Sequence, residues 1–346
     1  IILTFVLYSF SQGLNNVIGI ELLGYSKSPI STAMIAIVMG LFLGSIFRIR
    51  QGFLIGLDFT QKYILKLGII CLGIQLKPFE FYKFGTIAIP LIIICIISVL
   101  VIIKLLIKKL KISTRMAYLI SIGSTVCGTT AIMATAPIIS AKKNEVTYAI
   151  ANITVFGIIA MLLYPYFSNI YFDEQPLFVG LFLGTAIHET SQVAAAGLIY
   201  DQQFNSPETL NIATVTKLIR NTFLIIMIPL FALLYNRGQK REKNYSILNI
   251  FPYFVLGFIG MIILRNVGDE IFISTYQFLW ENFILNVKDS AKIFLSMAMA
   301  AIGLSTNLSD LKTMGYKPFV VGFVAMITVG IISIITIEFF SSFLFS

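Results

Sequence analysis

One stretch decides the class of fold: residues 177–198 read LFVGLFLGTAIHETSQVAAAGL. As a helix, this run is long enough to cross the roughly 30 Å hydrocarbon core of a bilayer, which takes about 20 apolar residues. Near its middle lie His188, the only histidine of the chain, and Glu189. Ionisable groups at that depth are costly unless they face a polar cavity or each other. The pair therefore predicts a functional site inside a membrane.

The composition of the whole chain agrees with a membrane protein. Hydrophobic residues make up 58% of the 346 positions and charged residues only 12%, and the mean hydropathy is +0.91. No soluble globular class has this composition, and continuous apolar runs favour helices over alternating strands. We expect an all-α polytopic fold with about eleven transmembrane helices, over residues 1–12, 30–47, 61–76, 86–106, 115–141, 145–167, 177–199, 209–235, 248–265, 288–308 and 317–343.

The net charge of +9 does not indicate a nucleic-acid partner. The basic residues cluster in short loops beside apolar segments, where they orient a protein in the bilayer. Loops after the even-numbered predicted helices are richer in Lys and Arg, which predicts a cytoplasmic N-terminus. The three cysteines lie inside apolar runs without a CxxC pattern, so we expect reduced thiols, no metal site and no cofactor.

A short repeat suggests how the helices are organised. GLFLG occurs at residues 40–44 and again at 180–184. Predicted helices two to six and seven to eleven form two sets of five, and the fourth member of each set is polar in its middle. An odd number of helices per set inverts the second copy, and inverted repeats with broken helices are a common transporter design. We expect an extra helix and loop over 1–29, a first five-helix repeat over 30–167 and a second over 168–346, with core and panel subdomains interleaved.

The polar member of the first set reads GSTVCGTTAIMATAP over Gly123–Pro137. Its glycines permit unusual backbone angles and its hydroxyls can cap a helix or bind a ligand, so we expect an unwound stretch and a helix that restarts near Gly128. Tight helix packing through small residues is the alternative. The candidate substrate-binding residues are Ser124, Thr125, Cys127, Gly128, Thr129 and Thr130.

The matching member of the second set reads AIGLSTNLSD over Ala301–Asp310. It combines glycine and hydroxyls again, and two such breaks could cross and face each other. An ordinary helix C-terminus with a capping Asn is the alternative. The candidate substrate-binding residues here are Gly303, Ser305, Thr306 and Asn307.

His188, Glu189 and Gln192 are the candidate coupling-ion or proton site. Thr185, His188 and Gln192 follow i, i+3, i+7 spacing, which predicts one polar stripe on a continuous helix. A histidine and a buried carboxylate can carry protons, and the carboxylate can also bind Na⁺. A buried pair that only braces two helices is the alternative.

Lys217 and Arg220 are the candidate counter-charges, within the segment NIATVTKLIRNTF. They could bind an anionic substrate or neutralise Glu189. The alternative is that both side chains extend to the membrane interface, because they lie within about three turns of the helix start.

Three kinds of enzyme find little support in the sequence. After His188 and Glu189, a zinc protease of the HExxH kind requires a second histidine, and the chain has no other. A thiol enzyme built on Cys127 has His188 as its sole candidate base, with no third orienting group. No GxxxxGK[ST] loop for an ATP-driven pump occurs. We expect the protein not to be an enzyme.

Three segments together resemble a known family. These are GSTVCGTTAIMATAP with Glu145, Tyr148, Ala149 and the following FGIIAMLLYP, then GTAIHETSQVAAAG over 184–197, and KLIR over 217–220. The chain resembles the YeiH-like family of bacterial membrane proteins, described as sulfate exporters. The resemblance implies a bacterial inner-membrane location and an architecture related to bile-acid symporters and sodium/proton antiporters. Such folds have a core domain with crossed, broken helices and a separate panel domain.

We expect a secondary active transporter of a small anion, such as sulfate, a sulfonate or a similar organic anion, coupled to H⁺ or Na⁺. The alternative is a passive anion channel or a ligand-sensing membrane protein of the same fold. The expected partners are the anionic substrate and the lipid bilayer, with a homodimer left open.

Overall fold

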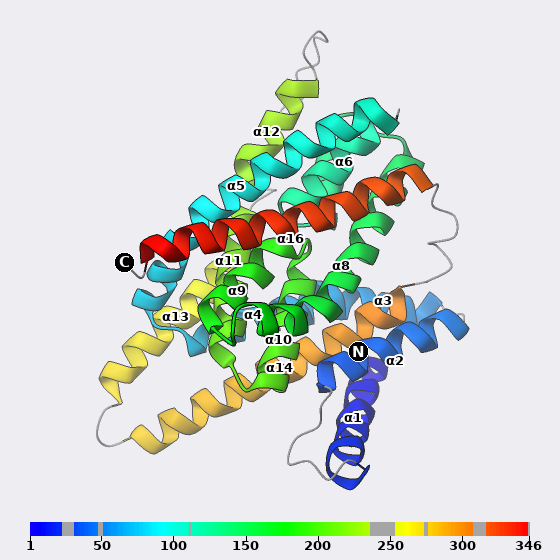
Figure 1. The fold of residues 1–346 in the computed structure, drawn as a ribbon. Helices are drawn as coiled ribbons and strands as arrows, with labels where there is room; N and C mark the ends of the chain where they lie inside the picture. Colours follow the sequence, from blue (N-terminus) through cyan, green and yellow to red (C-terminus); the bar gives the residue numbers. More distant parts are fainter. Residues whose placement is uncertain are drawn as a thin grey trace. The chain divides into compact units, whose positions relative to one another are not determined.

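The computed structural model describes residues 1–22, 31–47, 51–110, 112–235, 253–272, 276–306 and 316–344. These residues form helices and connecting turns, with no strand among them (Figure 1). The predicted all-α class is therefore confirmed.

Four described helical segments are long and apolar enough to cross a membrane: Pro78–Leu106, Asn144–Tyr171, Pro207–Phe231 and Phe319–Ser341. Two shorter apolar helices, Thr32–Ile46 and Pro176–Ala186, carry the two GLFLG sequences. Eleven spans and the inverted repeat stay predictions.

Contacts within the chain define two compact units, each discontinuous in sequence. Unit 1 comprises Ile1–Lys83, Ala194–Asn211 and Tyr253–Ser309, and unit 2 comprises Phe84–Val193, Ile212–Pro252 and Asp310–Ser346. Each unit draws on both predicted five-helix repeats, and the repeat boundaries at 30–167 and 168–346 stay a prediction.

Most helices of unit 1 are short. They are α1 (Ile2–Asn16), the π-helix η1 (Val17–Leu22), α2 (Thr32–Ile46), α3 (Gln51–Phe59), the π-helix η2 (Thr60–Ile64), α4 (Leu65–Leu72), the 3₁₀ turn η3 (Gly73–Gln75), the main part of α10 (Thr190–Phe204), α13 (Phe254–Ile271) and α14 (Gln277–Ser305). Ser31 caps α2, because its side chain accepts a hydrogen bond from the Met34 N–H at 3.1 Å. The apolar core of the unit includes Leu7, Ala36, Leu57, Ala300, Ala301 and Leu304.

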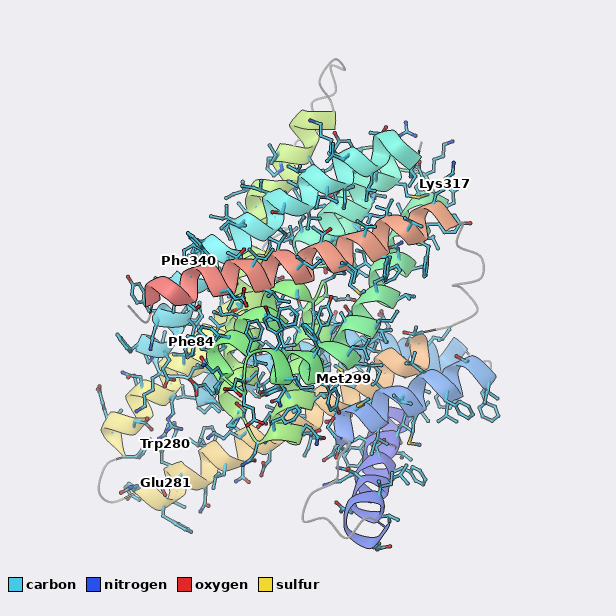
Figure 2. All side chains as sticks on the ribbon, viewed as in Figure 1. Phe84, Trp280, Glu281, Met299, Lys317 and Phe340 are labelled. Atoms are coloured by element: carbon cyan, nitrogen blue, oxygen red, sulfur yellow. The ribbon has the colours of Figure 1, made fainter. Side chains whose placement is uncertain are left out.

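Helices α2 and α14 pack backbone against backbone in unit 1. A Cβ built on Gly40 would lie 2.8 Å from the Ala300 carbonyl oxygen, and one built on Gly303 would lie 2.9 Å from the Gly40 Cα. Figure 2 labels Trp280 and Glu281 toward one end of α14 and Met299 toward the other. Met299 is fully buried whereas Glu281 is exposed, so the C-terminal half of α14 supplies the core of the unit.

Unit 2 contains long helices and two interrupted ones. Its helices are the main part of α5 (Pro78–Leu110), α6 (Thr114–Thr125), α7 (Thr129–Thr135), α8 (Lys143–Tyr171), α9 (Pro176–Ala186), the start of α10 (Thr190–Phe204), the main part of α11 (Pro207–Thr222), α12 (Leu224–Tyr235) and α16 (Tyr316–Leu344). The red helix of Figure 1, α16, packs on α6, α8 and α9. A hydrogen bond of 2.5 Å between the Thr185 and Ser333 hydroxyls joins α9 to α16.

Candidate functional site

The predicted interruption after Gly123 is present in unit 2. Helix α6 ends at Thr125 and α7 begins at Thr129. Gly128 between them has a φ of 70°, in a region that costs a residue with a Cβ free energy. The glycine at this position therefore allows the chain to leave one helix and start the next.

A second interruption lies at residues 187–189, between α9 and α10. The prediction of one continuous helix over 177–199 is therefore wrong. The predicted stripe of Thr185, His188 and Gln192 is consequently also wrong, because its i, i+3, i+7 spacing requires an unbroken helix. The HETS sequence, with a hydroxyl at the start of α10, is the local signal that could have indicated the break.

Lys217 on α11 is bonded to the backbone at both interruptions. Its ammonium group donates to the carbonyl oxygens of Val126 at 2.8 Å, Ile187 at 3.2 Å and His188. An ammonium has three N–H donors, so these three carbonyls use all of them. The side chain is only 1% exposed, which contradicts the alternative that it extends to the membrane interface.

Arg220, one turn further along α11, binds the same two helix ends. Its Nε donates to the Thr125 carbonyl at 2.8 Å and its Nη2 to the Ser124 carbonyl. Its Nη1 donates to the carbonyls of Thr185 at 2.6 Å and Ile187 at 3.0 Å. Arg220 is also 1% exposed. Four of the five N–H donors of a guanidinium group are thus bound to backbone oxygen.

The two cations neutralise the carboxyl ends of α6 and α9. Each helix end carries a partial negative charge of about half an elementary charge, concentrated on carbonyls without a helical partner. Buried carbonyls of this kind must find donors, and Lys217 and Arg220 supply them. Neither cation contacts the Glu189 carboxylate within ion-pair distance among the described residues. Direct contact of either cation with a substrate stays a prediction.

Glu189 lies at the meeting point of the two interruptions. Its Oε1 accepts a hydrogen bond from the Thr129 hydroxyl at 2.7 Å. A Cβ built on Gly128 would lie 3.1 Å from the Glu189 Cβ. The absence of a side chain at Gly128 therefore gives this carboxylate room beside the start of α7.

His188 and Gln192 flank Glu189, and both are buried, each with 1% exposure. The structure places no side chain in hydrogen-bond contact with the His188 ring among the residues it describes. Gln192 Nε2 donates to the Thr154 carbonyl on α8 at 3.1 Å, and the side chain packs against Gly157. Gln192 is thus turned to α8 rather than to Glu189.

The other candidate residues of the first break differ in their surroundings. The Ser124 hydroxyl is fully buried without a partner among the described residues. The Thr125 hydroxyl bonds back to the Ser121 carbonyl at 2.8 Å, as in the packing alternative. Cys127 is buried, whereas Thr130 is exposed.

The candidates of the second polar segment belong to unit 1. Gly303 lies inside α14, which continues to Ser305. The Ser305 hydroxyl accepts a hydrogen bond from Gln61 Nε2 at 2.7 Å, and the Thr306 hydroxyl bonds back to the Ile302 carbonyl at 2.8 Å. Asn307 lies outside the described residues. Substrate contact by this segment stays a prediction.

Metal-ligating side chains do not gather in the described part of the chain. No group of three or more His, Cys, Asp or Glu residues is close enough there to hold a metal ion. The polar groups at the two interruptions are hydroxyls, the Glu189 carboxylate, the His188 imidazole and the two cations that bind the backbone.

Known proteins similar to this chain are membrane proteins. A UPF0324 membrane protein of Streptococcus agalactiae is 37% identical over 314 residues, covering 90% of this chain and 91% of the relative. One of Fusobacterium nucleatum is 34% identical over 307 residues (86% and 88%), and one of Streptococcus mutans is 32% identical over 318 residues (90% and 91%). No solved structure matches the chain.

These matches and the apolar helices make the protein a multi-pass membrane protein. The family model named Conserved hypothetical protein 698 matches residues 5–322. The chain therefore belongs to the UPF0324 membrane protein family.

Proposed function

We propose that the protein is a secondary active transporter of a small anion, such as sulfate or a sulfonate, coupled to H⁺ or Na⁺. The observation that carries the proposal is the pair of interrupted helices whose carbonyl ends are held by Lys217 and Arg220. The resemblance to proteins described as sulfate exporters suggests the class of anion. The proposed cycle includes no covalent chemistry.

An interruption of a membrane helix costs free energy, because backbone groups at the break lose their helical hydrogen bonds. Non-helical backbone at membrane depth is tolerated only where protein or a water-filled cavity surrounds it. Secondary transporters use such breaks to present backbone and side-chain groups to substrate and coupling ions. The buried ionisable residues of unit 2 point the same way, because such residues commonly mark ion or substrate pathways.

The charges at the interruptions favour an anion. Lys217 and Arg220 supply two positive charges, and Glu189 supplies at most one negative charge. The two helix ends together add roughly one negative charge. The group is therefore close to neutral when Glu189 is ionised, and it lacks one negative charge when Glu189 binds a proton or Na⁺. A bound anion would fill this deficit, which links substrate binding to the coupling ion.

In this proposal Glu189 binds the coupling ion, with His188 as its neighbour in the site. The hydroxyls of Ser124, Thr129 and Thr130 are proposed to contact the anion. Lys217 and Arg220 favour the anion through their charge while they hold the backbone. The side chains that a substrate meets are thus distinct from those that maintain the interruptions.

Transport by purified protein in proteoliposomes tests the proposal. A thermal-shift screen with sulfate, sulfite, sulfonates, dicarboxylates and 2-oxoacids, each with and without Na⁺, selects the anion, because a ligand of the native state raises apparent stability. Uptake of that anion is then measured under imposed pH or Na⁺ gradients. We expect accumulation against the electrochemical gradient of the anion. Uptake that only equilibrates it identifies a passive channel and contradicts the proposal.

Glu189→Gln tests the coupling site within the same assay. The amide oxygen can still accept the Thr129 hydrogen bond, so we expect the variant to fold and to lose its response to the coupling-ion gradient. Glu281→Gln is the matched control, since Glu281 is an exposed carboxylate on α14. Wild-type dependence on pH and Na⁺ in Glu189→Gln would remove Glu189 from the coupling role.

A further inference from the structure

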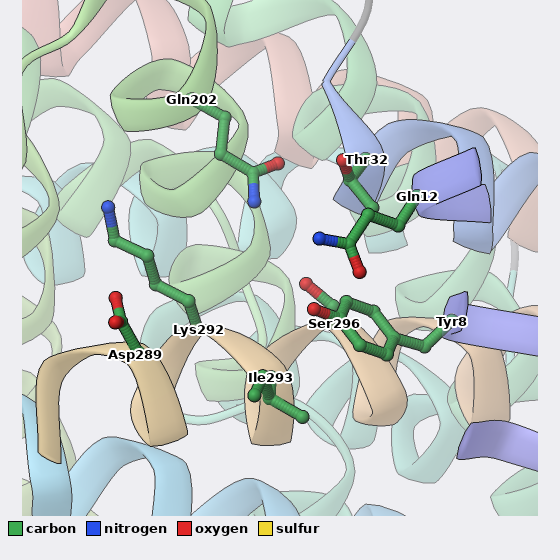
Figure 3. Close-up of a pocket in the computed structure, with 8 residues that line it drawn as sticks. All are labelled: Tyr8, Gln12, Thr32, Gln202, Asp289, Lys292, Ile293 and Ser296. Carbon is green, nitrogen blue, oxygen red and sulfur yellow. The ribbon is translucent and has the colours of Figure 1, made fainter. Parts of the chain in front are cut away.

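Unit 1 contains a polar cavity of about 410 Å³ among α1, α2, α10 and α14 (Figure 3). Its volume lies in the usual range of small-molecule sites, about 300 to 1,000 Å³. The cavity is lined by Tyr8, Gln12, Thr32, Gln202, Asp289, Lys292, Ile293 and Ser296. All but Ile293 carry a polar group, which is unusual for a cavity in a chain of this hydropathy.

The lining includes a buried hydroxyl in need of a partner. Ser296 is 0% exposed, and its Oγ has no hydrogen-bond partner among the described residues. Asp289, Lys292, Ile293 and Ser296 follow i, i+3, i+4, i+7 spacing and so share one face of α14. Figure 3 shows this face together with Tyr8 and Gln12 of α1. A hydrogen-bonding occupant would satisfy Ser296, whose hydroxyl is otherwise costly to bury.

Hydrogen bonds fix the opposite wall. The Ala33 N–H at the start of α2 donates to Gln202 Oε1 at 3.1 Å. With this oxygen bound to the backbone, the Gln202 Nε2 is turned into the cavity (Figure 3). Asn15 Nδ2 donates to the Thr32 hydroxyl at 2.8 Å. The cavity is thus held open by contacts that do not need a ligand.

The cavity presents a cation and an anion one helical turn apart. Lys292 Nζ lies 3.0 Å from Asp201 Oδ2, and Asp201 is 3% exposed. An ammonium has three donors, so this one pairing leaves donors for an acidic ligand group. Asp289 has no ion-pair partner among the described residues. It can therefore receive a ligand cation.

The charges around the cavity balance each other. Lys288 interacts electrostatically with Arg265, Lys292, Asp201 and Asp289, and Arg265 is itself paired with Asp269. Lys288 and Lys292 therefore face two carboxylates, Asp201 and Asp289. A balanced set offers little net attraction to a simple anion or cation. It complements a ligand that carries one group of each sign.

We propose that this cavity binds a small zwitterionic solute with an ammonium group and a carboxylate or sulfonate group. The ammonium group pairs with Asp289, the acidic group accepts from Lys292 and Gln202 Nε2, and Ser296 bonds to a polar atom of the solute. The site belongs to unit 1 alone, and it does not depend on the proposed anion transport.

Calorimetric titration of the purified protein tests the proposal. The probes are glycine, β-alanine and 2-aminoethanesulfonate, with acetate, ethylamine and glycerol as probes that lack one or both charges. We expect at least one zwitterion to bind at least tenfold more tightly than all three of these. The carboxylate and sulfonate arms decide which acidic group the site takes. Equal binding of acetate or glycerol, or binding of no zwitterion, overturns the proposal.

Variants locate the binding. Asp289→Asn is expected to weaken zwitterion binding by about tenfold or more, since one charged hydrogen bond is lost. Ser296→Ala is expected to weaken it several-fold. Asp58→Asn is the matched control, because Asp58 is an exposed carboxylate of the same unit that pairs with Lys62 at 2.8 Å. Both Asp variants should fold, because both side chains are exposed. Unchanged affinity in Asp289→Asn contradicts the proposed site.

Discussion

The two units contain similar GLFLG helices in different surroundings. In unit 1, a GLFLG helix, α2, packs through Gly40 and Gly44 on the continuous helix α14. In unit 2, the GLFLG helix α9 stops after Ala186, and α6 stops after Thr125. Gly40 and Gly303 bring two backbones together, and Gly184 likewise lets α9 pack closely on α11, whereas Gly128 after α6 permits the backbone to turn. The difference follows from the neighbours, since only the second pair lies against buried cations that bind free carbonyls.

Removal of Arg220 gives the largest expected effect. Arg220→Ala leaves the carbonyls of Ser124, Thr125 and Thr185 without their donor. Each unpaired buried carbonyl costs about 1 to 3 kcal/mol, so we expect a loss on the order of 4 kcal/mol in the free energy of unfolding. The thermal midpoint in detergent measures it.

An exposed ion pair is the control for Arg220. Lys62→Ala removes a pair with Asp58 whose side chains are 62% and 58% exposed, and it should cost less than about 1 kcal/mol. Equal losses in Arg220→Ala and Lys62→Ala would show that Arg220 does not maintain the interruptions.

Crowding of the α2–α14 crossing gives the second-largest expected effect on stability. Gly40→Ala places a methyl group 2.8 Å from the Ala300 carbonyl oxygen, so the backbones must separate. We expect a loss of about 1 to 3 kcal/mol, as for overpacked cores. Gly13→Ala on α1 is the matched control, because nothing lies within 4 Å of its added Cβ. A helical Gly→Ala change without crowding should instead stabilise by about 0.5 to 1 kcal/mol. A stabilised Gly40→Ala would contradict the close crossing.

The turn at Gly128 has a smaller expected effect on stability. Gly128→Ala must adopt a φ of 70° with a ψ of −126°, which costs a residue with a Cβ about 1 to 2 kcal/mol. The added methyl group also lies 3.1 Å from the Glu189 Cβ. We therefore expect a large fall in the transport rate and only a small fall in the free energy of unfolding. A variant with normal uptake would separate the Gly128 turn from the proposed site.

The sequence allowed one interruption to be predicted, whereas for the other it offers only the hydroxyls of HETS as a local signal. Gly123 and Gly128 with their hydroxyl neighbours are a local signal, and α6 does end between them. Residues 185–189 contain neither glycine nor proline. Their break instead depends on Lys217 and Arg220, which are distant in sequence. Gly303 carried the same local signal as Gly128, yet it lies within a helix, because its role is close packing on α2.

The smallest expected effect concerns a charge at the edge of unit 1. Asp269, beyond the predicted span 248–265, accepts hydrogen bonds from Trp280 Nε1 at 2.8 Å and Arg265 Nε at 2.7 Å. Burial raises the pKa of its carboxyl, but these bonds outweigh burial and hold the pKa below its ordinary value. A lowered folded-state pKa gives stability that is present above the unfolded pKa and is lost as pH falls through the folded value.

The thermal midpoint of the wild type should therefore fall more steeply than that of Asp269→Asn as pH drops below about 4, the ordinary range of an aspartate. The Asp269 side chain is 32% exposed, so solvent screening limits the difference to under about 1 kcal/mol. Parallel curves of thermal midpoint against pH for the two proteins would show that the hydrogen bonds to Asp269 do not stabilise the fold. A loss of stability in Asp269→Asn as large as that in Arg220→Ala would contradict the contrast between the units. Unit 1 would then be stabilised by a partly exposed charge as strongly as unit 2 is by a buried one.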